Sequence, residues 1–248
     1  MRCVRVCLGA VMAVSVLRGA EVCCGAGAAP NTLTAAEQRE GWRLLWDGRT
    51  PEGWQRRNGA AFPEKGWEIA DGVLTVLPKN AGGGAGDIIT RETFSSFILK
   101  VDFRLTDAAN SGIKYFFDPA LHGGTAPEYQ VLDAKHPDAA KGRDGNRTVA
   151  SLYDVLPAAG AKPKPVGEWN TAMIVCRGRQ VEHWLNGEKV LAFERGSEAF
   201  RQAVARSKFS KHPQWGEQSA GRILLQDHQD RVSYRNLKIR VLPDERAL

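Results

Sequence analysis

Cysteine is scarce beyond the first residues of this chain. Four of its five cysteines lie within residues 1–24, and the fifth is Cys176. If the N-terminal leader described below is removed, the remaining chain cannot form an internal disulfide. Cys176 ends the apolar run Met173-Ile-Val-Cys, which indicates a buried small side chain and not an exposed nucleophile.

The N-terminal apolar run is too short to span a bilayer. It extends from Leu8 to Leu17, about half of the roughly 20 residues that a spanning helix needs. Arg2 and Arg5 precede this run, and a small-x-small pattern typical of signal-peptidase sites follows it at Ala26-Gly-Ala28. We therefore predict a signal peptide over residues 1–28 and no transmembrane segment in the mature chain.

Export places the mature protein in the periplasm or outside the cell. The adjacent residues Cys23 and Cys24 raise the alternative of a lipid anchor. Glu21 and Val22 fit poorly before a lipidated cysteine, so cleavage after Ala28 is the prediction that we retain.

The chain also lacks the usual marks of nucleic-acid and dinucleotide binding. Loss of the leader lowers the net charge from +6 to +4, because three arginines and one glutamate leave with it. The remaining cations are scattered and form no stripe interleaved with aromatic residues, so we expect no nucleic-acid partner. No G-x-G-x-x-G sequence opens a helix, and an NAD site is therefore not expected.

Short strand-like segments with intervening turn residues make up most of the chain. Asp71-Gly72 and Asn186-Gly187 are typical of two-residue hairpin turns. Helical patterns are limited to residues 35–40 and 197–209, the latter with Ser197 as a possible N-cap. This pattern predicts an all-β fold, an antiparallel β-sandwich or jelly roll with one or two short helices, over residues 38–243 after an N-terminal segment of residues 29–37. Asn110-Ser-Gly112 is a turn by residue type.

The most informative segment is Gly221–Val241, where polar side chains replace aliphatic ones. Leu224, Gln226 and His228 share one strand face by alternation. A buried core has no use for a glutamine and a histidine two residues apart unless they are satisfied, so this face indicates either a site or a solvated sheet edge. The following strand, residues 232–241, shows an alternation that slips by one residue between Tyr234 and Leu237.

Six motifs occur in an order that resembles one family. They are residues 41–54, Asn110-Ser-Gly-Ile-Lys114, Glu128-Tyr-Gln-Val-Leu-Asp133, Gly167-Glu-Trp-Asn170, His183-Trp-Leu-Asn-Gly187 and the Leu-Gln-Asp-His…Tyr-Arg-Asn segment. Together they are similar to the 3-keto-disaccharide hydrolase family, formerly a domain of unknown function, from about residue 41 to 242. The resemblance implies a concanavalin A-like lectin and glucanase sandwich. Lys114 stands where arginine is expected in the family, which keeps the cation but loses bidentate geometry.

The resemblance implies a carbohydrate substrate, a 3-keto glycoside or disaccharide. A ketone at C3 acidifies the proton on C2, so the glycosidic bond at C1 can break by proton abstraction and elimination, followed by addition of water. Such a site needs a base near C2, an electrophile at the C3 oxygen and an acid for the leaving oxygen. We predict Glu128, His228 and Lys114 as catalytic residues, with Glu128 or His228 as the base. No cofactor is certain, and a divalent cation held by carboxylates and histidine is an alternative to Lys114.

Further residues are predicted to bind the sugar. These are Asn110, Gln130, Asp133, Tyr153, Trp169 and Gln226. Tyr153 and Trp169 either stack on a sugar ring or fill the core, and Asp133 either contacts ligand or flanks an edge strand. His183 is expected to be a packed, hydrogen-bonded histidine, and His136, in a predicted loop, receives no role.

Two other functions stay open on sequence alone. Glu128-Tyr-Gln130-Val-Leu-Asp133 has the spacing of the Glu-x-Asp-x-x-Glu signature of retaining sandwich β-glucanases, with Gln and Asp at its second and third acidic positions. The second alternative is a non-catalytic carbohydrate-binding module, which needs the same concave sheet but no base.

Mass spectrometry of the exported protein tests the leader. We expect Ala29 at the N-terminus. A lipid on Cys23 or Cys24, or an uncleaved cytoplasmic form, would contradict this prediction.

Overall fold

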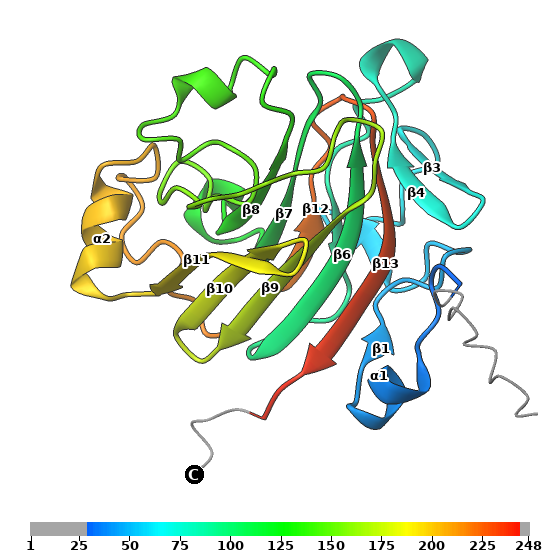
Figure 1. Cartoon of the computed structure of the whole chain (residues 1–248), viewed down its shortest axis with the longest axis horizontal. Helices are drawn as coiled ribbons and strands as arrows, with labels where there is room; N and C mark the ends of the chain where they lie inside the picture. The colour runs from blue at the N-terminus through cyan, green and yellow to red at the C-terminus, as the bar shows by residue number, and fades with distance from the viewer. Residues whose placement is uncertain (1–28, 244–248) are drawn as a thin grey trace, which may run out of the picture.

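Two antiparallel β-sheets pack face to face in the computed structural model, which describes residues 29–243 (Figure 1). The predicted signal peptide lies outside the described residues. The sandwich with two short helices that the sequence predicts is confirmed. In the described part of the chain, no helix is both long and apolar enough to cross a bilayer.

The larger sheet has eight strands. In the order of their pairing they are β11 (Glu188–Glu194), β10 (Gln180–Leu185), β9 (Asn170–Arg177), β6 (Phe97–Leu105), β13 (Val232–Val241), β4 (Val73–Val76) and β3 (Trp67–Ala70), while β1 (Arg43–Leu44) also pairs with β13. The last strand in the described part of the chain, β13, therefore lies in the interior of this sheet, between β6 and β4.

The smaller sheet has five strands and carries the polar face. In order they are β2 (Trp54–Arg56), β5 (Ile88–Thr90), β12 (Arg222–Leu225), β7 (Asn110–Phe117) and β8 (Glu128–Leu132). Although β12, β7 and β8 come from distant parts of the sequence, they are neighbours here. Side chains from three separate motifs can therefore meet on one face.

Turn chemistry sets the hairpins as predicted. Ala70 pairs with Val73 across Asp71-Gly72, and both turn residues have a positive φ. Asn186 and Gly187 have φ values of 52° and 90° and join β10 to β11. Since both central residues of a tight type I′ turn need positive φ, Asn-Gly and Asp-Gly are the residue pairs that favour it.

The slip in alternation predicted in the last strand is a β-bulge. The pairing of β13 with β6 shifts between Arg235 and Lys238, and Asn236 has a φ of 52°. Asn236 also holds the start of the described chain, because its side-chain oxygen accepts from the backbone of Asn31 and its backbone donates to the Asn31 side chain.

The core lies between the sheets and is built by strand alternation. Every second side chain of β6, beginning with Phe97, is buried while the intervening ones are partly exposed. Cys176 and His183 are fully buried, as predicted. His183 is satisfied by the Tyr115 hydroxyl at 2.9 Å and the carbonyl of Ala150 at 2.8 Å.

The helices are short and capped. Helix α1 (Ala35–Arg39) begins with a capping box between Thr34 and Glu37. Helix α2 (Glu198–Ala205) begins after Ser197, whose hydroxyl accepts from the backbone of Phe200. Single 3₁₀ turns occur at η1 (Lys79–Ala81), η2 (His122–Gly124) and η3 (Ala139–Lys141).

Two local predictions are wrong. The second helix ends at Ala205 and not at Phe209, because the positions after Val204 that would continue its apolar stripe are the polar Ser207 and Lys208. Asn110-Ser-Gly112 is not a turn but the beginning of β7, since pairing with β8 overrides the turn preference of these residues.

A second bulge shapes the outer face of the smaller sheet. Phe116 has a φ of 54°, and the pairing of β7 with β12 shifts between Arg222 and Leu224. As a result Phe116 points into the main core, while Phe117 joins Ile89, Ala126 and Leu224 in a separate apolar cluster. Leu224 lies on the outer face of the smaller sheet, and Gln226 and His228 come two and four residues after it on the same face.

Replacement of Gly187 by alanine tests the turn geometry. A Cβ at this position would meet nothing within 4 Å, so the φ of 90° alone determines the effect. We expect the free energy of unfolding to fall by about 1 kcal/mol or more in urea denaturation. The exposed neighbour Glu188→Ala is the control, with an expected change within about 0.5 kcal/mol. Equal stability of Gly187→Ala and the wild type would contradict the argument.

Candidate active site

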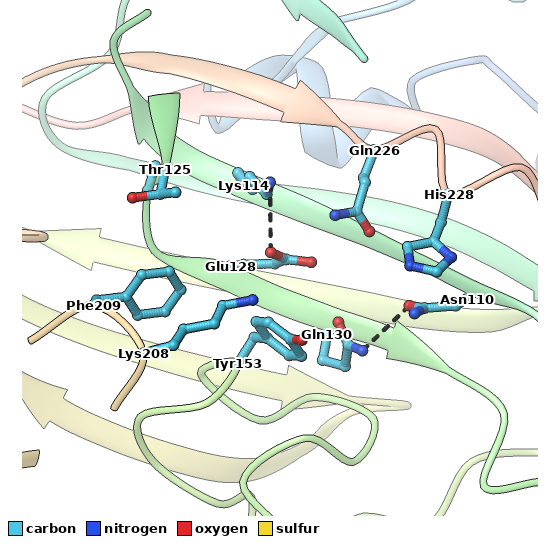
Figure 2. A pocket seen from close by; sticks show the side chains of 11 residues that line it. Asn110, Lys114, Thr125, Glu128, Gln130, Tyr153, Lys208, Phe209, Gln226 and His228 are labelled. Atoms are coloured by element: carbon cyan, nitrogen blue, oxygen red, sulfur yellow. Dashed lines mark hydrogen bonds and ion pairs between the residues drawn. The ribbon is translucent and has the colours of Figure 1, made fainter. Parts of the chain in front are cut away.

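A polar pocket of about 140 Å³ lies on the outer face of the smaller sheet. A cavity on the order of 150 Å³ accommodates one six-membered ring. The residues that line it are Asn110, Lys114, Thr125, Ala126, Glu128, Gln130, Tyr153, Lys208, Phe209, Gln226 and His228 (Figure 2). Seven of the nine predicted site residues therefore meet in one pocket.

Strand pairing places the two central charges side by side. Lys114 of β7 pairs with Glu128 of β8, and its Nζ lies 3.7 Å from Oε2 of Glu128. Both side chains are about nine-tenths buried or more. Figure 2 shows the Glu128 carboxylate between the ammonium ends of Lys114 and Lys208.

Gly112 makes room for this carboxylate. It precedes Lys114 by two residues on the same strand face, and a Cβ there would lie about 2.0 Å from Oε1 of Glu128. Any other residue at this position would push the carboxylate out of place. The glycine of the Asn-Ser-Gly motif thus serves close packing and not a turn.

Burial changes the acidity of the pocket residues. Loss of water raises the pKa of the Glu128 carboxyl, and the neighbouring charges of Lys114 and Lys208 only partly offset this effect. Burial likewise lowers the pKa of Lys208, while Glu128 opposes that shift. Burial and a hydrogen bond to Asp138 raise the pKa of Tyr153, which therefore stays a neutral phenol. Glu128 is consequently a stronger base than an exposed glutamate.

One end of the pocket is lined by amides. Nε2 of Gln130 donates to Oδ1 of Asn110 at 3.3 Å, and Oε1 of Gln130, fully buried, has no hydrogen-bond partner among the described residues. Gln226 is fixed through its backbone, which donates to Gly112 and accepts from the hydroxyl of Ser111. A buried acceptor without a partner is costly, so the Gln130 oxygen indicates a ligand that donates a hydrogen bond.

Two predicted site residues lie elsewhere. The carboxylate of Asp133 accepts from the backbone of Ala108 at 2.6 Å and secures the turn before β7. Trp169 lies between two guanidinium groups, with those of Arg104 and Arg235 4.7 and 4.2 Å from its ring centroid. Arg104 and Arg235 belong to β6 and β13 of the larger sheet, whereas the pocket lies on the smaller sheet. The prediction that Trp169 forms a wall of the pocket is therefore wrong.

Lys208 and Phe209 were not predicted as pocket residues, because the sequence pattern indicated a helix over these positions. The turn after α2 instead brings Nζ of Lys208 to 4.1 Å from the ring centroid of Tyr153. The polar pair Ser207-Lys208 after Val204 was the signal that the helix had ended. Thr125 and Ala126 carry no comparable signal in the sequence.

Next to the pocket, three side chains form a possible cation site. A nitrogen of His136, a nitrogen of His228 and an oxygen of Asp230 lie within 4.8 Å of one another. However, the backbone N–H of Asp138 donates to Nδ1 of His136 at 3.1 Å. A neutral His136 therefore carries its hydrogen on Nε2, the nitrogen that faces Asp230, and this hydrogen occupies the position a cation needs.

The fold and pocket together define a β-sandwich with a polar pocket on the outer face of its smaller sheet, lined by amides and by a buried pair of opposite charges. The family model of the 3-keto-α-glucoside-1,2-lyase-like domain matches residues 41–240, and the chain belongs to this family. The family resemblance inferred from the six motifs is thereby confirmed.

Relatives are similar over nearly their whole length. A 3-keto-disaccharide hydrolase of Bacteroides thetaiotaomicron is 34% identical over 240 residues, which cover 86% of this chain and 82% of that protein. A crystal structure from Parabacteroides distasonis, named a "putative glycosyl hydrolase", is 30% identical with a TM-score of 0.76, covering 87% of this chain and 100% of that one. Another structure of the same name and organism is 26% identical with a TM-score of 0.59, covering 82% and 84%.

Replacement of Glu128 by glutamine separates function from stability. Because the folded protein raises the pKa of Glu128, the ionised carboxyl disfavours folding, and this penalty is present at neutral pH and absent below the unfolded-state pKa. We expect Glu128→Gln to keep or raise the free energy of unfolding at neutral pH, with an advantage that shrinks in mild acid. Urea denaturation at both pH values measures it. A large loss of stability at neutral pH would mean that the ion pair with Lys114 outweighs burial.

Proposed function

We propose that this protein cleaves the glycosidic bond of 3-keto glycosides by removing the C2 proton and eliminating the C1 oxygen. The observation that carries the proposal is the buried Glu128 carboxylate, held between Lys114 and Lys208 in a pocket that His228 also lines. The name of the Bacteroides thetaiotaomicron relative, a 3-keto-disaccharide hydrolase, supports the same substrate class.

The reaction needs no redox step once the ketone is present. A base takes the proton from C2, and the electrons of that C–H bond form an enolate with the C3 carbonyl. The enolate then re-forms the ketone and a C1–C2 double bond while the C1–O bond breaks, and the leaving oxygen accepts a proton. Water added across the double bond gives the 3-keto sugar, so the overall outcome is hydrolysis.

Glu128 is suited to act as the base at C2. Its burial raises its pKa and thus its strength as a base. Lys114 and Lys208 lie on either side of it and are suited to stabilise the negative charge that develops on the C3 oxygen. Positive charges already in place for the enolate lower the barrier without reorganisation of water.

His228 is suited to protonate the leaving oxygen. Its side chain is about 45% exposed, compared with 6% for Glu128, so it lies nearer the mouth of the pocket. The leaving group departs toward solvent, where an imidazole can give and take a proton. The same side chain can then activate the water that adds to C1.

The amide end is suited to sugar hydroxyls. A hydroxyl can donate to the unpartnered Oε1 of Gln130 and accept from the amide of Asn110 or Gln226. A ketone can only accept. The carbonyl is therefore expected near the lysines, with hydroxyls toward the amides.

A retaining β-glucanase reaction is less well supported. That mechanism needs two carboxyl groups about 5–5.5 Å apart. Among the described residues that line the pocket, Glu128 is the sole carboxylic acid, while Asp133 is occupied with the backbone of Ala108. The predicted signal peptide supports action in the periplasm or outside the cell.

Incubation with a 3-keto glucoside beside its unoxidised parent tests the proposal. We expect cleavage of the 3-keto compound alone, measured by mass spectrometry and NMR of the products. Glu128→Gln and His228→Ala should each lower turnover by about 100-fold or more.

Three outcomes would contradict the proposal. Saturable binding of both sugars without product would indicate a binding module. Cleavage of the unoxidised parent would favour a glucanase-type reaction. Full activity of both variants would remove Glu128 and His228 from the mechanism.

A further inference from the structure

We propose that Asp230, supported by His136, is a positioning residue that fixes the orientation and proton placement of His228. This inference rests on the proposed function, in which His228 exchanges a proton with the substrate through the ring nitrogen that faces away from Asp230. His136 and Asp230 do not themselves line the pocket.

The three side chains form a compact group at the pocket mouth. Oδ2 of Asp230 lies 3.5 Å from Nδ1 of His228 and 3.9 Å from Nε2 of His136. The two imidazole rings are nearly perpendicular, at 84°, with their centroids 5.6 Å apart. The same oxygen of Asp230 thus faces a ring nitrogen of each histidine.

Asp230 is itself hydrogen-bonded to β7, the strand that carries Asn110 and Lys114. Its Oδ2 accepts from the backbone N–H of Asn110, the first residue of β7, at 3.1 Å. The side chain of Asp230 therefore links the imidazole of His228 to the backbone of Asn110 in β7. A shift of Asp230 would move the histidine relative to the amides.

One hydrogen bond to His136 indicates which of its ring nitrogens bears the hydrogen. Since the N–H of Asp138 donates to its Nδ1, the hydrogen of neutral His136 lies on Nε2, directed at Asp230. Asp138 in turn accepts from the hydroxyl of Tyr153, a pocket residue. At 3.9 Å this N–H does not hydrogen-bond to Asp230, but it directs the positive end of its dipole toward the carboxylate.

The same carboxylate then selects the tautomer of His228. A carboxylate facing Nδ1 favours a hydrogen on that nitrogen, which leaves Nε2 as the position that gives or takes the substrate proton. The oxygen that faces Nδ1 is the same Oδ2 that accepts from the N–H of Asn110, so an amide that keeps this hydrogen bond presents a neutral oxygen to Nδ1 and removes the negative charge that favours a hydrogen there. The arrangement does not suit a cation, because Nε2 of His136 bears a hydrogen.

Asp230→Asn is the informative substitution, because it keeps size and the acceptor for the N–H of Asn110. We expect kcat on a 3-keto glucoside to fall about 10- to 100-fold with KM changed less than about 3-fold. In ¹⁵N NMR of the imidazole rings, neutral His228 should carry its hydrogen on Nδ1 in the wild type and lose this preference in Asp230→Asn. Asp227→Asn is the matched control from the same turn, since Asp227 bonds to the backbones of Gly86 and Gln229, and it should keep the wild-type kcat and tautomer.

The measurements separate failure of this inference from failure of the proposed function. An inactive wild type would refute the function, while the NMR comparison would still test the positioning. Wild-type kcat and an unchanged His228 tautomer in Asp230→Asn would overturn the inference. Activity lost after treatment with EDTA and restored by Zn²⁺ or Mn²⁺ would overturn it in favour of a cation held by the same three side chains.

Discussion

The ion pair between Lys114 and Glu128, buried on the outer face of a β-sheet, is the constraint on which the rest of this structure depends. Two charges removed from water cost several kcal/mol each unless they are paired and hydrogen-bonded. The fold imposes this cost by covering β7 and β8 on both faces, so that every residue of both strands is buried, and the charges of Lys114 and Lys208 offset it only in part for Glu128. One face packs against the larger sheet, and the other lies under the segments that carry Tyr153 and Lys208.

This cover explains why the site is assembled from distant loops. The segment around Arg147 and Asp154 carries Tyr153, and Arg147 joins Asp154 and Asp138 at 2.7 and 2.9 Å. Asp154 also accepts from the backbone N–H of Lys208 at 2.7 Å. A second, largely buried charge network thus fixes the side of the pocket that strand pairing does not reach. This network holds the backbone of Lys208 in place and so positions its side chain in the pocket with Glu128.

Much of the fold, and seven of the eleven residues that line the pocket, could be predicted from strand alternation, turn chemistry and the family motifs. Gln226 and His228 were recognisable because they share a strand face with Leu224, where alternation predicts further aliphatic side chains. The hairpin turns were recognisable because Asp71-Gly72 and Asn186-Gly187 are residue pairs that adopt a positive φ. Lys208 and Trp169 were not predictable in this way. Which sheet face a loop residue such as Trp169 reaches depends on its arginine neighbours, and the place of Lys208 depends on where α2 ends.

The central position of β13 has a consequence for how the chain acquires its fold. β13, the last strand of the described residues, pairs with β6 and β4, which lie more than a hundred residues earlier in the sequence. Contacts between such distant segments form slowly, because a long loop must close before they stabilise anything. The larger sheet is therefore divided between β6 and β4 until β13 takes its place. Until then β6 and β4 each present an unpaired edge, and such edges are the part of a sheet most prone to pair with another chain.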